Sequence, residues 1–429
     1  MLQVPGLIFC VAAVLVAVTV GRLRWPLPLG LISAAILAAL LSGYWIPFRH
    51  LVEGGFGYMN LVLGLFAGAF FGQAMRASGA SEAVALSVEK ILLGRTWLIL
   101  CFSAVILFLV GMFVGIAGIA VLATGVFVVP QLRRLGLQGH EIGAFIAVIA
   151  TCGMIAPPLN VPAMTISDGV NMPYAGFVLP LLVLSVPPAA VMLIMTGLAA
   201  RGRSRAAPAE ADRGAAVTGF VALGLVLGFW ALLRAFPSAI PDPAAPVILV
   251  AGGLVALPRM LGARLGEVIK STFVGVPLIL AAVLVTVGIA VQIMTLTGIR
   301  GWAVINTMAI PEPWTYLGLV LLPLFGGVLT SMGTSNVLGV PFAFALIGQD
   351  MILNSAALSA ISALSEFVPP TSIAAALSVY IVGDTTLGRV LRASLIPVLV
   401  IAALAVLMLI FADSLAGPLS TSGIGPRDH

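Results

Sequence analysis

The sequence contains few charged residues, which make up 8% of its 429 positions. Soluble globular domains carry about 25% charge, so most of this chain is not solvated by water. A hydrophobic fraction of 61% and a mean hydropathy of +1.21 indicate a membrane protein instead. Lys and Arg outnumber Asp and Glu by 20 to 15. The basic residues lie between apolar runs, where they orient the chain toward the cytoplasm rather than bind nucleic acid.

Cysteine and histidine are also scarce, with three of each. Cys10, Cys101 and Cys152 lie in apolar stretches without a CxxC pattern, which is typical of small buried side chains. The sequence shows no constellation of nucleophile, base or metal ligands, so we expect neither an enzyme nor a bound cofactor. The N-terminus lacks the basic region of a secretory signal, and we predict a first helix that stays in the membrane.

Long apolar runs are what the sequence does contain. About 20 apolar residues are needed to cross a bilayer as a helix, and we predict such spans at 4–21, 26–46, 57–75, 96–114, 176–198, 216–235, 245–258, 272–296, 314–331 and 392–412. Shorter apolar pieces lie at 117–130, 142–156, 159–168, 337–348, 355–368 and 371–382. Because Gly and Pro flank these pieces, they are expected to form half-helices and re-entrant hairpins.

One polar stretch, residues 200–215, separates two membrane halves at 1–199 and 216–429. It reads ARGRSRAAPAEADRGA and holds four arginines. Short loops rich in arginine resist translocation. The sequence therefore predicts a cytoplasmic linker between two membrane domains.

The two halves repeat the same landmarks, including a tandem proline. The pairs are separated by 216 residues for Gly111 and Gly327, 212 for Pro157 and Pro369, 216 for Asp168 and Asp384, and 217 for Pro180 and Pro397. Internal duplication with broken helices at matching places is typical of secondary transporters. We predict an all-α integral membrane protein with two inverted repeats, each having a re-entrant hairpin and a discontinuous helix.

The tandem prolines free backbone carbonyls, which are costly in hydrocarbon unless protein, water or an ion satisfies them. Oxygen ligands suit a hard cation such as sodium, and half-helix N-termini suit an anion. The predicted substrate and cation site comprises Gly115, Thr151, Gly153, Pro157, Pro158 and Asn160 in the first half. In the second half it comprises Gly333, Thr334, Ser335, Asn336, Ser365, Glu366, Pro369, Pro370 and Thr371. Sodium itself is assigned to Thr334, Ser335, Asn336 and Asn160.

Glu366 is the most informative single residue, because a carboxylate inside a membrane segment is costly and usually functional. We predict that it neutralises a coupling ion or carries a proton in exchange; the alternative is a carboxylate at a helix end. Asp168 and Asp384 are expected near the far ends of their half-helices, in a helix-capping or an interface role.

The segments GMIAPPLN and VPPTSIAAALSVYIVGD resemble the large membrane (permease) subunit of TRAP transporters, within the ion transporter superfamily. The likeness covers most of residues 57–198 and 314–412. It implies sodium-coupled uptake of a small organic anion, such as a carboxylate, by an elevator mechanism. It also implies a small membrane subunit and a periplasmic substrate-binding protein as partners. Two features depart from the family pattern: EFVPP at the second break, and GTSN, which is closer to the hairpins of sodium–dicarboxylate carriers.

Two alternatives remain open from the sequence. The chain could be a stand-alone dicarboxylate or anion carrier of the same superfamily, or a channel-like membrane subunit. No arginine lies at either break, so the residues there do not identify the substrate. A carboxylate would need helix dipoles and hydroxyls, or an arginine brought from elsewhere in the fold.

Overall fold

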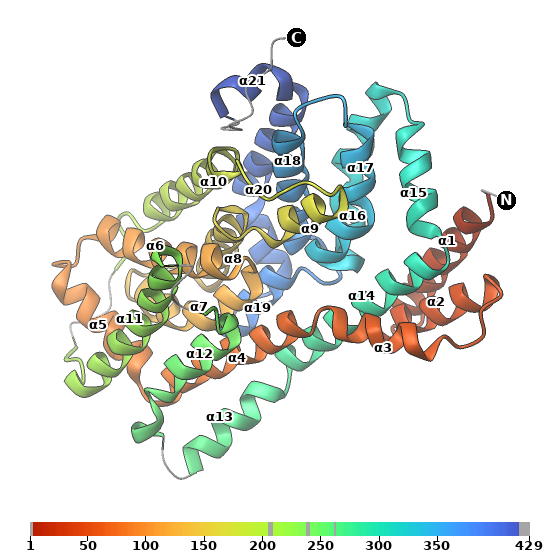
Figure 1. The fold of residues 1–429 in the computed structure, drawn as a ribbon. Coiled ribbons are helices and arrows are strands. Elements are labelled where there is room, and N and C mark those ends of the chain that lie inside the picture. Colours follow the sequence, from red (N-terminus) through yellow and green to blue (C-terminus); the bar gives the residue numbers. More distant parts are fainter. Residues whose placement is uncertain (1–2, 205–208, 237–240, 261–262, 420–429) are drawn as a thin grey trace.

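The computed structural model describes residues 3–204, 209–236, 241–260 and 263–419, and this part of the chain is helical without a strand (Figure 1). The first half contains α1 (Gln3–Val16), the π-helix η1 (Ala17–Arg22), α2 (Leu27–Leu41), α3 (Phe48–Gly57), α4 (Met59–Ala77), α5 (Ala80–Ile91), α6 (Thr96–Val114), α7 (Ala117–Arg134), α8 (Gly139–Ile155), α9 (Val161–Gly169) and α10 (Val178–Ala199). The second half contains α11 (Arg213–Ala235), α12 (Ala244–Leu254), η2 (Leu257–Arg259), α13 (Ala263–Phe273), α14 (Val276–Leu296), α15 (Ile299–Met308), α16 (Glu312–Thr334), η3 (Ser335–Gly339), α17 (Val340–Ala345), α18 (Met351–Ala363), η4 (Leu364–Phe367), α19 (Ile373–Val382), α20 (Leu387–Ile410) and α21 (Ala412–Leu419).

Each half contains one helical hairpin. In the first, α6 turns at Gly115 into α7, and the Ser103 hydroxyl on one arm donates to the Gln131 side chain on the other at 2.6 Å. In the second, α16 turns at Thr330 and returns through η3 and α17, so that Gly318 faces the Phe342 ring across the two arms. The predicted spans at 96–114 and 314–331 are therefore hairpin arms.

A broken helix follows each hairpin. The first is α8 and α9 around Pro157–Pro158, and the second is α18, η4 and α19 around Pro369–Pro370. Both proline pairs have a cis peptide bond. The predicted discontinuous helices thus occur at both of the repeated positions.

The two hairpins enter from opposite ends of the molecule. Arg133, at the open end of the first hairpin, lies 3.2 Å from Asp384, just before α20 begins. Asp350, just after the second hairpin, donates its backbone N–H to Asp413, just past the other end of α20. Because α20 is a helix of 24 residues, these contacts lie far apart along its axis. The repeats are therefore inverted, as the sequence predicts.

The number of full spans differs from the ten that the sequence predicts. Seven described helices are long and apolar enough to cross a bilayer, or eight if the bent pair of α3 and α4 forms one span. The expected spans at 26–46 and 245–258 fold as helices of only 15 and 11 residues. Short helices with a polar face, such as α5 and α13, were missed because a search for continuous apolar runs does not detect them.

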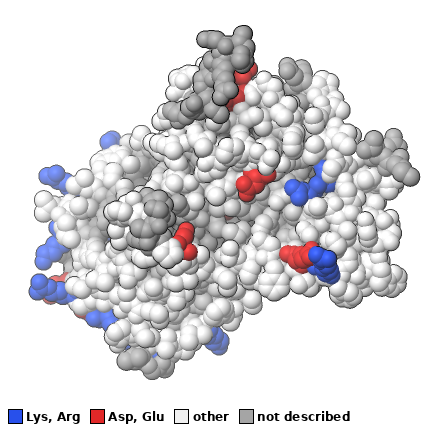
Figure 2. All heavy atoms as spheres, in the orientation of Figure 1, with Lys and Arg blue, Asp and Glu red and all other residues white. Residues whose placement is uncertain are grey.

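Basic side chains gather along one edge of the molecule, over α5, α11 and α13 (Figure 2). The ends of the linker are fixed at this edge. Arg203 donates to both carboxylate oxygens of Glu141, at 2.6 and 2.8 Å, and Arg259 pairs with Asp212. The backbone N–H of Ala215, with further help from Gly214 and Arg259, holds the pKa of Asp212 below its usual range. Residues 205–208 of the predicted linker lie outside the described residues.

A cysteine introduced at Ser204, in a variant without Cys10 and Cys101, is expected to resist membrane-impermeant maleimide added to intact cells. Ser204 is exposed and follows Arg203, which pairs with Glu141 at the end of the linker, and the positive-inside rule assigns this arginine-rich linker to the cytoplasm. The same cysteine should react fully once the cells are permeabilised. Rapid labelling from outside would show that the linker faces the periplasm.

Candidate functional site

The first break is closed by Asn160, which is fully buried between α8 and α9. Its side-chain oxygen accepts from the Ala163 N–H at 2.9 Å and so caps α9. Its amide nitrogen donates to the Ile155 carbonyl at 2.9 Å and to the Ser359 hydroxyl of the second half at 3.1 Å. Asn160 therefore satisfies the backbone that the prolines free, and links the two halves.

Gly115 fits the tip of the first hairpin against this break. Its φ of +70° favours glycine, and a Cβ there would lie 2.6 Å from the Leu159 carbonyl oxygen. Gly153 packs as tightly, since a Cβ would lie 2.4 Å from the Phe108 carbonyl oxygen. The Thr151 hydroxyl donates to the Ala147 carbonyl of its own helix at 2.8 Å. The first break is thus tightly packed, and the side chains of Thr151 and Asn160 both have hydrogen-bond partners.

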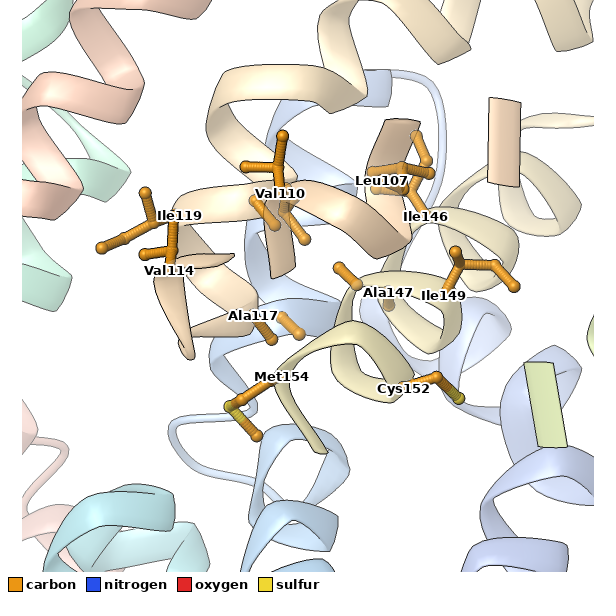
Figure 3. Close-up of a cluster of buried hydrophobic side chains, with 14 of the residues drawn as sticks. Leu107, Val110, Val114, Ala117, Ile119, Ile146, Ala147, Ile149, Cys152 and Met154 are labelled. Atoms are coloured by element: carbon orange, nitrogen blue, oxygen red, sulfur yellow. The ribbon is translucent and has the colours of Figure 1, made fainter. Parts of the chain in front are cut away.

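Apolar side chains surround the end of α8. Figure 3 shows Met154 in a buried cluster with Val114 and Ala117 of the first hairpin. Met154 precedes Glu366 by 212 residues and occupies the equivalent place in the repeat. The two halves therefore differ at this position both in chemistry and in backbone, since Met154 lies in the α-helix α8 and Glu366 in the 3-10 helix η4.

In the second break, Glu366 joins the hairpin tip to the next half-helix. It is buried, with 3% of its surface exposed. The Ser331 hydroxyl, beside the hairpin turn, donates to its Oε1 at 2.7 Å, and the Ala374 N–H at the start of α19 donates to Oε2 at 3.0 Å. The carboxylate therefore caps α19. Ser372 occupies the N-cap position of this helix, but its side chain forms no capping hydrogen bond.

The hairpin tip itself has an unusual backbone. Thr330, 215 residues after Gly115, has φ +62° and ψ +172°, a region that is nearly exclusive to glycine. Ser372 on the other side of Glu366 also has a positive φ, of +41°. Such conformations cost on the order of 1–3 kcal/mol each and cluster at functional sites. The backbone on both sides of Glu366 is therefore strained.

The tip and the break are in direct backbone contact. The Thr371 N–H donates to the Gly327 carbonyl at 3.1 Å. Next to it, a Cβ on Gly326 would overlap the Ser365 hydroxyl and lie 3.0 Å from that of Thr334. These two hydroxyls therefore both lie beside Gly326, although 31 residues separate them in sequence.

Several buried hydroxyls around Glu366 have no hydrogen-bond partner within the described structure. They belong to Thr330, Ser362, Ser365, Thr371 and Ser372. Buried polar groups normally find partners, and a cluster without partners indicates a place where something binds. We call these five residues, together with Glu366 and Ser331, the second-break cluster.

The other predicted residues of the second half lie along the returning arm of the hairpin. Thr334 and Ser335 are fully buried, and their hydroxyls donate to the carbonyls of Thr330 and Ser331 at 2.7 and 2.9 Å. Each retains an oxygen lone pair. Asn336 has a buried side-chain oxygen without a partner. Gly333 packs instead on Val287 of α14. The structure thus brings Thr334 close to the second-break cluster, whereas the side chain of Asn160 forms its hydrogen bonds within the first break and to Ser359 of α18.

Arg300 is a residue that the sequence analysis missed. It lies in α15, and its guanidinium donates to the Asn336 backbone carbonyl at 3.4 Å and to the Thr295 hydroxyl at 3.1 Å. Across the described chain it forms no ion pair. No local signal marks Arg300, because it lies 36 residues before Asn336 and only the fold brings the two together.

The first half of the sequence matches the model of a known family. Residues 11–201 match the family model of the tripartite ATP-independent periplasmic transporter, DctM component. The match ends within the predicted linker. The resemblance to the large TRAP subunit is confirmed over these residues, and the apolar helices of the described chain are those of a multi-pass inner-membrane protein. DctM components work with a small membrane subunit and a periplasmic binding subunit.

One solved structure aligns with most of the chain. The crystal structure of the Alcanivorax borkumensis YdaH transporter, described as having an unusual topology, aligns with a TM-score of 0.44 at 16% identity, covering 87% of this chain and 89% of that one. The comparison with curated proteins gave no match.

Proposed function

We propose that this DctM-type protein couples the inward movement of sodium to uptake of a small organic anion, a carboxylate. The observation that carries the proposal is the second-break cluster, in which a buried carboxylate is surrounded by hydroxyls without partners. Its chemistry suits a monovalent hard cation. An anion alone would not be attracted to Glu366.

The geometry supports sodium in three ways. Hydroxyl and carboxylate oxygens are ligands that hard cations prefer. Each Glu366 oxygen accepts one hydrogen bond and so keeps lone-pair capacity for an ion. The negative charge would compensate the ion in a medium of low dielectric constant. Thr334, beside Ser365, is a further candidate ligand.

For the organic anion, we assign Arg300. Its guanidinium is not neutralised by a carboxylate in the described structure, and it contacts the returning arm of the second hairpin at Asn336. Arginine binds carboxylates in a bidentate geometry. Because α15 lies outside the hairpin, the anion would be held between this helix and the cation-binding tip.

We further propose an elevator movement of the hairpins and broken helices against the remaining helices, together with a periplasmic binding protein and a small membrane subunit. The inverted hairpins support this proposal, because they give each side of the membrane its own hairpin. The alternatives, a stand-alone carrier or a channel-like subunit, differ in whether uptake requires a binding protein and whether it saturates.

Sodium should raise the melting temperature of the purified protein more than potassium does, because a ligand that binds the folded state stabilises it. Ser365→Ala, Thr371→Val, Thr334→Ala and Asn336→Ala should each raise the sodium concentration for half-maximal stabilisation, by about fivefold if one ligand contributes ~1 kcal/mol. Ser185→Ala is the matched control, since this buried serine lies on α10 and bonds to the Leu181 carbonyl.

Arg300→Gln should keep this sodium response and lose stabilisation by acetate and succinate, used as mono- and dicarboxylate probes. Equal stabilisation of the parent protein by sodium and potassium would contradict the cation assignment. A sodium response that all four oxygen variants retain unchanged would place the ion elsewhere.

A further inference from the structure

A cavity of about 480 Å³ lies between the N-terminal helices and the second break. One wall comes from α1, η1, α2, α14 and the start of α15. The opposite wall comes from Val328 and Leu329 before the hairpin turn, and from Pro369 and Pro370. The cavity is open along α1, since Ala13, Ala17 and Gly21 line it and are nevertheless exposed.

Small side chains create this space. Ala13, Ala17 and Gly21 recur every four residues on one face of α1 and η1, and alanines of α2 face them. Every lining residue is apolar. Water needs two to four polar partners to occupy a cavity, and a small carboxylate would find no donor side chain here. The surrounding solvent in a membrane is lipid, so the fitting occupant is an alkyl chain.

Two arginine side chains place positive charge at one end of the cavity. Arg22 and Arg24 lie in the short link between Gly21 and Leu27, both of which line it. Both arginines are exposed, and neither pairs with a carboxylate in the described part of the chain. No Asp or Glu occurs in the sequence before Glu53. This end would attract a phosphate group.

We propose that the cavity binds an acyl chain of an anionic phospholipid, with the lipid phosphate held at Arg22 and Arg24. The chain would lie against Val328, Leu329 and the second proline pair. It would thereby support, from the apolar side, the same tip and break whose polar side forms the second-break cluster. The bound lipid acts as a structural ligand of the second hairpin.

Trp302 can report on occupancy, because its ring lies 6.4 Å, centroid to centroid, from Phe9 in the cavity wall. In a full-length variant whose other five tryptophans are replaced by phenylalanine, nanodiscs would contain phosphatidylcholine with increasing fractions of phosphatidylglycerol brominated on its acyl chains. Quenching of Trp302 should saturate at a low fraction of brominated phosphatidylglycerol. Brominated phosphatidylcholine should need a higher lipid fraction to give the same quenching, by about fivefold for each arginine.

Ala17→Phe should abolish the saturable quenching by filling the cavity. Val18→Phe is the matched control, because Val18 is also exposed but does not line the cavity. Arg22→Gln with Arg24→Gln should remove the preference for phosphatidylglycerol and keep the quenching. Saturable quenching that persists in Ala17→Phe would overturn the proposal. Equal quenching by the two lipids in the parent protein would also overturn the proposal. Displacement of the brominated lipid by succinate would overturn it as well, because the cavity would then belong to the path of the anion.

Discussion

Replacing Glu366 with glutamine is expected to abolish the sodium-specific rise in melting temperature while the protein still folds. Glutamine keeps the volume and can still accept from the Ala374 N–H, so the cap of α19 is preserved. What it removes is the charge. A unit charge at about 4 Å from a cation contributes about 4 kcal/mol at an effective dielectric constant of about 20, so the half-maximal sodium concentration should rise at least tenfold. The measurement is a sodium titration of thermal stability, with potassium as reference.

Glu82→Gln provides the control, since it removes an exposed carboxylate at the start of α5. If Glu366 carries a proton instead of neutralising sodium, the glutamine variant should lose the pH dependence of uptake rather than the sodium response. If uptake by the variant kept its normal rate and its dependence on both sodium and pH, Glu366 would act only as a helix cap.

Replacing Gly327 with alanine is expected to cause a large loss of stability together with loss of the sodium response. The new Cβ would lie 2.2 Å from the Pro369 carbonyl oxygen, and backbone cannot rotate away from it as a side chain could. The Thr371–Gly327 hydrogen bond would open. Overpacking of this kind typically costs about 1–3 kcal/mol, and the separation of tip and break would disperse the hydroxyls of the second-break cluster. Thermal unfolding with and without sodium measures both effects.

Gly228→Ala is the matched control on α11, where an added Cβ meets nothing within 4 Å. There alanine should stabilise the helix by about 0.5–1 kcal/mol. If Gly327→Ala retained the parent melting temperature and sodium response, the close contact between tip and break would not hold the site.

Strong local signals explain what could be predicted. The tandem prolines at 157 and 369 fix both helix breaks, because proline cannot continue the hydrogen-bonding pattern of a helix. The apolar runs fix most of the long helices, and the repeated landmarks together with the arginine-rich linker predict inverted halves. The family resemblance in the first half is confirmed for the same reason: it rests on contiguous motifs.

The different roles of the polar side chains at the two breaks could not be predicted from the residues alone. Both have a tandem proline and nearby polar side chains, yet Asn160 satisfies the first break with its own hydrogen bonds. In the second, Glu366 takes the capping role and leaves the hydroxyls around it without partners. Which side chain meets which freed backbone group depends on angles at the break that sequence spacing does not specify.

The sequence by itself determined an all-helical membrane protein with two broken halves, because hydropathy and proline act within a single segment. Only the tertiary structure decided that Ser331 and Glu366 meet, that Thr330 takes the place of Gly115 at a hairpin tip, and that Arg300 reaches Asn336. These contacts join segments that are far apart in sequence. Packing between helices determines these contacts, and the local conformational preferences of the residues contain no information about that packing.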